Sequence, residues 1–154
     1  MAQHTKSSIL RSVIDEVERL SGRFAAVTAR LAEGTGVSAS ELVVLTAVVR
    51  APRPPTVPQI GRSLGHTRQS VQRLADALVQ RGMLAWADNP DHARARLLTA
   101  TAEGRAAYAI ADGQVDPWAT GVTRGITADE LASLAADLHR LRVHVEDVER
   151  QRRS

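Results

Sequence analysis

The chain has 154 residues, of which 44% are hydrophobic and only 3% aromatic, so a single domain with an aliphatic core is expected. It contains no cysteine, which excludes disulfides and thiol switches, and no apolar run approaches the ~20 residues of a membrane span. The net charge is +3, yet residues 53–96 carry seven arginines against three aspartates, a local excess that suits nucleic acid or is simply a solvated surface.

The first part of the chain predicts two helices. Apolar residues recur every three or four positions over residues 7–32, which is typical of a long amphipathic helix. Ser38 and Glu41 form a capping box at the start of a second helix. That helix ends near Arg50, because three prolines in the next five residues prevent its continuation.

Two shorter helices follow, separated by only two or three residues. Thr56 is expected to cap the third helix, which Gly65 ends. Thr67 is expected to cap the fourth, which runs to about Gln80. Two helices joined by so tight a turn predict a helix-turn-helix.

A β-hairpin and two further helices complete the predicted elements. Residues 83–87 and 96–101 indicate two short strands joined by turn residues. A fifth helix is expected over residues 102–123, bent near Gly113 and Pro117. A capping box at residues 127–130 begins a sixth helix. The predicted fold is therefore mainly α, with six helices and a small β-hairpin wing.

The fourth helix has one apolar and one polar face. At 100° per residue, Val71, Leu74, Ala75 and Leu78 fall on one side and are expected to be buried. The opposite side carries Gln69, Gln72, Arg73 and Asp76. The donors and acceptors of the two glutamines and the arginine suit base edges in a major groove. On one isolated helix such a face is usually solvated surface. The order of short helix, tight turn, polar-faced helix and arginine-bearing hairpin favours a DNA-binding winged helix-turn-helix.

The same segments resemble the multiple-antibiotic-resistance regulator (MarR) family over nearly the whole chain. The matching stretches are residues 37–45 (VSASELVVL), 56–65 (TVPQIGRSLG), 67–74 (TRQSVQRL), 80–84 (QRGML), 88–97 (DNPDHARARL) and 101–104 (TAEG). The ordered set carries the resemblance, since no single stretch is decisive. Two positions depart from the family's pattern: His92 stands where many members carry a wing aspartate, and Leu42 replaces a usual aromatic residue.

The resemblance implies a bacterial transcriptional regulator, expected to be a cytoplasmic repressor that binds a pseudo-palindromic operator as an obligate homodimer. Residues 37–101 would form the DNA-binding region, and residues 1–36 and 102–154 the dimerisation region, within one compact domain. Arg94 matches the wing arginine that enters the minor groove. The expected DNA contacts are Thr67, Arg68, Gln69, Ser70, Gln72 and Arg73 on the recognition helix, Arg94 and Arg96 on the wing, and Arg62 and His66 at phosphates. The expected dimer contacts are Ile9, Val13, Leu131, Leu134, Leu138, Leu141 and Val145.

The apolar stripe of the sixth helix has two interpretations. Its coiled-coil spacing is satisfied either by the chain's own core or by a partner helix. Periodicity alone favours packing within the chain. The length of the first and last helices favours a partner subunit, because both would otherwise project from a small winged-helix core.

Other functions are less well supported by the sequence. No glycine-rich phosphate loop, nucleophile elbow or zinc-helix motif is present, and His139 and His144 are five residues apart, off the spacing that shares a metal ion. We therefore expect no enzymatic activity, no cofactor and no metal. A winged-helix module for protein contacts, without specific DNA binding, is the alternative. The family also implies a small aromatic or lipophilic effector in a cleft, with Tyr108 and Trp118 as candidate neighbours.

Overall fold

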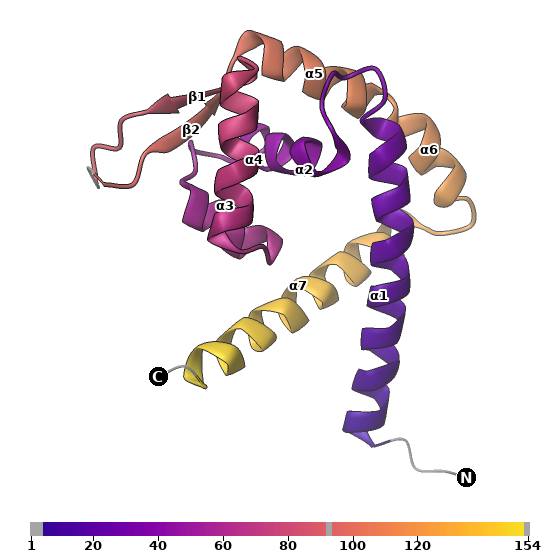
Figure 1. The fold of residues 1–154 in the computed structure, drawn as a ribbon. Helices are drawn as coiled ribbons and strands as arrows, with labels where there is room; N and C mark the ends of the chain where they lie inside the picture. The colour runs from indigo at the N-terminus through magenta and orange to yellow at the C-terminus, as the bar shows by residue number, and fades with distance from the viewer. Residues whose placement is uncertain (1–4, 92–93, 153–154) are drawn as a thin grey trace. The chain divides into compact units, whose positions relative to one another are not determined.

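The computed structural model describes residues 5–91 and 94–152 and confirms a mainly helical fold with a two-stranded hairpin (Figure 1). The chain divides into two compact units, one ending at Val115 and one beginning at Asp116. The elements are α1 (Lys6–Leu31), α2 (Ala39–Val49), α3 (Val57–Leu64), α4 (Arg68–Gln80), β1 (Leu84–Ala87), β2 (Leu97–Ala100), α5 (Ala102–Gly113), α6 (Val115–Val122) and α7 (Ala128–Gln151).

The predicted caps begin their helices. The Ser38 hydroxyl accepts a hydrogen bond from the Glu41 amide, and the Glu41 carboxylate accepts from the Ser38 amide at 2.8 Å. The same reciprocal bonds occur at α3 and at α7, where the capping threonines are Thr56 and Thr127. Because these bonds join residues only three apart, helix starts could be predicted from the sequence to within one or two residues.

The expected fifth helix is interrupted. The structure has two helices over this span, α5 and α6, and Gln114 caps the end of α5. Pro117 lies in the first turn of α6, where its missing amide hydrogen costs no intrahelical bond. A break at Gln114 therefore replaces the predicted bend.

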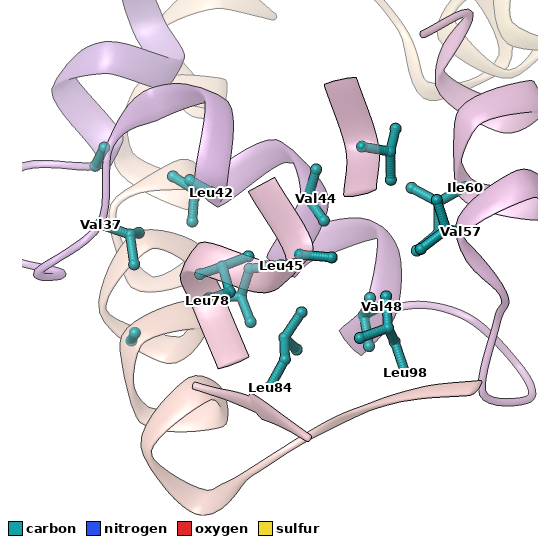
Figure 2. Packing of buried hydrophobic residues seen from close by; sticks show 14 of the residues in the cluster. Val37, Leu42, Val44, Leu45, Val48, Val57, Ile60, Leu78, Leu84 and Leu98 are labelled. Carbon is teal, nitrogen blue, oxygen red and sulfur yellow. The ribbon is translucent and has the colours of Figure 1, made fainter. Parts of the chain in front are cut away.

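The core of the first unit is built around α2. Leu45 and Val44 are fully buried, and side chains from α3, α4 and both strands converge on them (Figure 2). Leu78 of α4 and Leu98 of β2 are also fully buried. Apolar side chains surround α2 on several sides, so it is the central helix of the unit rather than an amphipathic surface helix.

The hairpin is attached to the start of α3. Leu84 pairs with Ala100 and Trp86 with Leu98 in an antiparallel ladder. The Leu98 amide also donates to the Pro55 carbonyl at 2.9 Å, and an isolated bridge joins Thr56 to Leu97. These bonds fix the base of the wing against the helix-turn-helix, and the rest of the hairpin extends beyond the helices (Figure 1).

The long helices α1 and α7 have exposed apolar faces. Neither has a buried residue in its helical span. On α1, Ile9 is 50% exposed and Leu20 is 45% exposed; on α7, Leu134 and Val145 are each 53% exposed. None of the helices within the described ranges is long and apolar enough to cross a membrane.

Candidate nucleic-acid interface

The turn between α3 and α4 places the two helices close together. Gly65 ends α3 with φ = 66°, a left-handed conformation that glycine adopts without strain. A Cβ on Gly61 would lie 3.0 Å from the His66 carbonyl oxygen, and the His66 amide donates to the Gly61 carbonyl at 2.9 Å. Glycines at these two positions allow the helix-turn-helix to close tightly.

Helix α4 buries its apolar face and presents its polar one, as the spacing predicts. Val71, Ala75 and Leu78 are fully buried. Arg68, Gln69 and Arg73 are exposed, while Gln72 and Ser70 are half-buried. Thr67 caps the helix by accepting from the Ser70 amide at 3.2 Å.

The wing and α4 enclose a hollow of about 730 Å³ that unites several of the predicted DNA contacts. Arg68 and Gln72 line it from α4, and Arg94 and Arg96 line it from the wing. The start of α3 and Trp86 of β1 complete its walls. Three arginines against Asp76 make this hollow electropositive and suited to a phosphate backbone.

The other predicted contacts lie on neighbouring surfaces. Gln69 and Arg73 line a second hollow along α4, together with Arg68 and Gln72. His66 and Ser70 line a third hollow, beside the start of α2. Arg62 is exposed in the last turn of α3 and borders none of these three hollows. His92 lies outside the described residues, so its position relative to Arg94 stays a sequence observation.

Sequence reasoning did not find the contact between Arg96 and Trp86. The Arg96 guanidinium carbon lies 5.4 Å from the Trp86 ring centroid, a cation–π distance. Trp86 pairs with Leu98, so Arg96 is its diagonal neighbour across the hairpin. The pair follows from the strand register, which residue spacing alone does not specify.

An ion pair between an exposed arginine and a largely buried carboxylate joins the end of α4 to the start of α2. The Arg81 guanidinium donates to the Glu41 carboxylate at 3.0 Å, and the Glu41 side chain is only 10% exposed. Burial raises the pKa of Glu41, but hydrogen bonds from Ser38 and the charge of Arg81 outweigh it and leave that pKa below its ordinary value. The carboxylate therefore stays ionised while it joins the two helices.

The predicted dimer contacts are not packed as a core. Ile9, Leu134, Leu138 and Val145 are between 40% and 53% exposed. Val13, Leu131 and Leu141 are half-buried.

A separate cavity of about 820 Å³ lies in the first unit, between α2, α5 and the proline-rich turn. At its edge Arg50 donates to the Tyr108 hydroxyl at 2.8 Å and to the Asp112 carboxylate at 2.9 Å. Tyr108 in turn donates to Asp112 at 2.7 Å. The hydrogen bonds from Tyr108 and Arg50 lower the pKa of Asp112. The predicted neighbour Tyr108 thus lines a cavity, whereas Trp118 lies on α6.

No cluster of metal-ligating side chains occurs over residues 5–91 and 94–152.

Residues 35–95 match the MarR family model. A stretch of 50 residues is 52% identical to the uncharacterised protein Rv2011c of Mycobacterium tuberculosis and covers 32% of this chain and 35% of that protein, so the match spans about a third of the relative. The MarR family transcription regulator SP03579 matches 97% of this chain and 99% of its own, with a TM-score of 0.74 and 21% identity. CouR from Rhodococcus jostii RHA1, solved with p-coumaroyl-CoA, matches 82% of this chain and 88% of its own, with a TM-score of 0.72 and 21% identity. The family match covers residues 35–95, less than half of the chain, and the solved structures show that the chain has the winged-helix fold of MarR family regulators.

Proposed function

We propose that the protein is a sequence-specific DNA-binding transcriptional regulator, a repressor without catalytic activity, that acts in the cytoplasm. The observation that carries the proposal is the hollow between α4 and the wing, which Arg68, Arg94 and Arg96 line together with Gln72. Arginines neutralise phosphates and pair with guanine, and a glutamine amide pairs with adenine. One surface therefore combines groups for backbone contact with groups for base readout.

The attachment of the wing suits simultaneous contact with two grooves. The bond from Leu98 to Pro55 holds the hairpin at the start of α3, and a tight turn joins α3 to α4. Helix α4 would enter a major groove, and Arg94 on the wing would enter the adjacent minor groove. The amides at the start of α4, around the Thr67 cap, would face a phosphate.

The exposed apolar faces of α1 and α7 support a homodimer. Half-exposed leucines and valines at helical spacing on both helices are best covered by the same surfaces of a second copy. In this arrangement residues 1–36 and 102–154 hold two copies together, and residues 37–101 of each contact DNA. The operator would then contain two half-sites about one helical turn apart.

The cavity beside Tyr108 is proposed as the site of a small aromatic or lipophilic effector. Its walls are largely aliphatic and proline side chains, with Arg50 and Arg53 as the cations. CouR, which has the same fold, was solved with an aromatic acyl-CoA, p-coumaroyl-CoA. An effector bound here would displace α2 and α3, against which the recognition helix α4 packs, and would so release the DNA.

The test is selection of binding sites from random duplexes, followed by salt titration of the selected duplex. Affinity should fall steeply with salt. Arg94→Ala should reduce the magnitude of the slope of log affinity against log salt by roughly 2, because a dimer loses two charged contacts with DNA. Arg124→Ala, which removes an exposed arginine from the α6–α7 turn, should leave the slope unchanged. Duplex binding that is absent, or that does not depend on salt, would favour the protein-interaction module instead.

A further inference from the structure

The polar face of α4 contains a hydrogen-bonded pair whose acid is unusual for a DNA-contacting surface. Gln72 Nε2 donates to Asp76 Oδ1 at 3.0 Å. Both residues line the hollow toward the wing and also the hollow along α4, so they form the ridge between the two. Any duplex that occupies these hollows would meet this pair.

Asp76 accepts a hydrogen bond from a glutamine, although three arginines line the same hollow. Arg68, Arg94 and Arg96 line the same hollow. Nevertheless, within the part of the chain that the structure describes, no ion pair includes Asp76, and its recorded side-chain hydrogen bond comes from Gln72. The carboxylate therefore acts on the amide of Gln72 rather than on the guanidinium groups.

An ionised carboxylate can only accept hydrogen bonds, so it distinguishes the two ends of an amide. The nitrogen of Gln72 is attracted to Asp76 and the oxygen is repelled, which disfavours the rotation of the amide that would exchange the two. The oxygen and the second N–H hydrogen remain available as an acceptor and a donor. Adenine offers a matching donor at N6 and acceptor at N7 in the major groove, whereas guanine offers only acceptors at N7 and O6.

We propose that Asp76 is a specificity-determining positioning residue, which fixes the amide of Gln72 so that Gln72 selects adenine over guanine. This inference rests on the proposed DNA-binding function. Without Asp76 the amide could rotate and donate from its nitrogen to guanine, so the base preference would relax. A glutamine and an aspartate four residues apart also stabilise an isolated helix, which is the simpler role that an experiment must separate from this one.

Base-preference profiles from random duplexes separate the two roles, using the full chain and four variants. Gln72→Ala identifies the base position that Gln72 contacts. Asp76→Ala should reduce the preference for adenine over guanine at that same position by about tenfold and leave the other positions unchanged. Asp76→Glu keeps a carboxylate within reach of the amide and should retain the preference. Glu103→Gln, which removes an exposed acid from α5, controls for charge and should also retain it.

The outcomes are distinguishable from failure of the proposed function. If the unmodified protein selects no duplex, both proposals fail. If it selects an operator and Asp76→Ala shows the same profile, or if the Gln72 position prefers guanine, the role of Asp76 is overturned while DNA binding stands. A helical circular dichroism spectrum of Asp76→Ala that matches the unmodified protein shows that the change in profile does not come from unfolding.

Discussion

Helices α4 and α7 both carry apolar residues at steps of three and four, but the two apolar faces are buried to very different extents. On α4, Val71, Ala75 and Leu78 are fully buried against the rest of the first unit. On α7, Leu134 and Val145 are 53% exposed. Periodicity therefore shows that a helix has an apolar face, but not which surface covers it. The chain supplies that surface for α4, and a second copy is the proposed cover for α7.

The largest expected effect comes from placing a charge on the apolar face of α7, which should weaken the proposed dimer. In Leu134→Glu the dimer would lose the burial of a half-exposed leucine, worth roughly 1 kcal/mol, and would have to desolvate a carboxylate, at a cost of several kcal/mol. Because the dimer contains two copies, its dissociation constant should rise by at least about 100-fold. Sedimentation equilibrium over a range of concentrations measures this change.

The matched control is Ala136→Glu, whose side chain lies about 200° around the same helix at 100° per residue. It adds the same charge to the opposite, exposed face and should leave the dimer intact. If Leu134→Glu remained as dimeric as Ala136→Glu, the face of α7 would not be the subunit interface, and the comparison with α4 would need another explanation.

Gly104 lies in the first unit, where α4 is buried, and a substitution there tests how tightly this unit is packed. A Cβ at this position would lie 2.0 Å from the Met83 carbonyl oxygen and 3.3 Å from Leu45 Cδ1. Gly104→Ala must therefore push α5 away from Met83, and the free energy of unfolding should fall by about 1–3 kcal/mol or more. Urea unfolding measures the loss, and the difference from the unmodified protein should be the same at every protein concentration.

Gly113→Ala is the control for Gly104→Ala, because nothing lies within 4 Å of the added Cβ in the same helix. It should be neutral or slightly stabilising, since alanine favours helix more than glycine. Equal losses in the two variants would mean that α5 responds to the side chain itself rather than to the contact with Met83.

The sequence predicted the elements that depend on local chemistry. The bonds of the Ser38–Glu41 and Thr127–Glu130 caps join residues three apart, and the turn residues at 88–91 predict the hairpin that the structure shows. It did not predict the central position of α2, because that helix is buried by elements distant in the chain. The break at Gln114 was placed near Gly113 and Pro117 but expected only as a bend.

The candidate site was predicted in composition rather than in geometry. The face of α4 and the wing arginines followed from spacing and from the resemblance to the MarR family. The hydrogen bond from Gln72 to Asp76, the Arg96 contact with Trp86, and the network of Arg50 with Tyr108 each need a rotamer, a strand register or a tertiary contact that residue spacing does not specify.

The smallest expected effect concerns the polar link inside the packed unit. Glu41→Gln keeps an oxygen for Ser38 but loses the charge beside Arg81, which is about half exposed, so stability at neutral pH should fall by less than about 1 kcal/mol. The folded-state pKa of Glu41 lies below its ordinary value of 4.5, so its contribution is present above pH 4.5 and is lost as the pH falls through the folded-state value. Urea unfolding of both proteins should therefore show a difference that is constant near neutrality and shrinks below pH 4.5. Glu130→Gln, the corresponding change in the exposed cap of α7, provides the comparison. A difference for Glu41→Gln that grew toward low pH would contradict the assigned direction of the pKa shift.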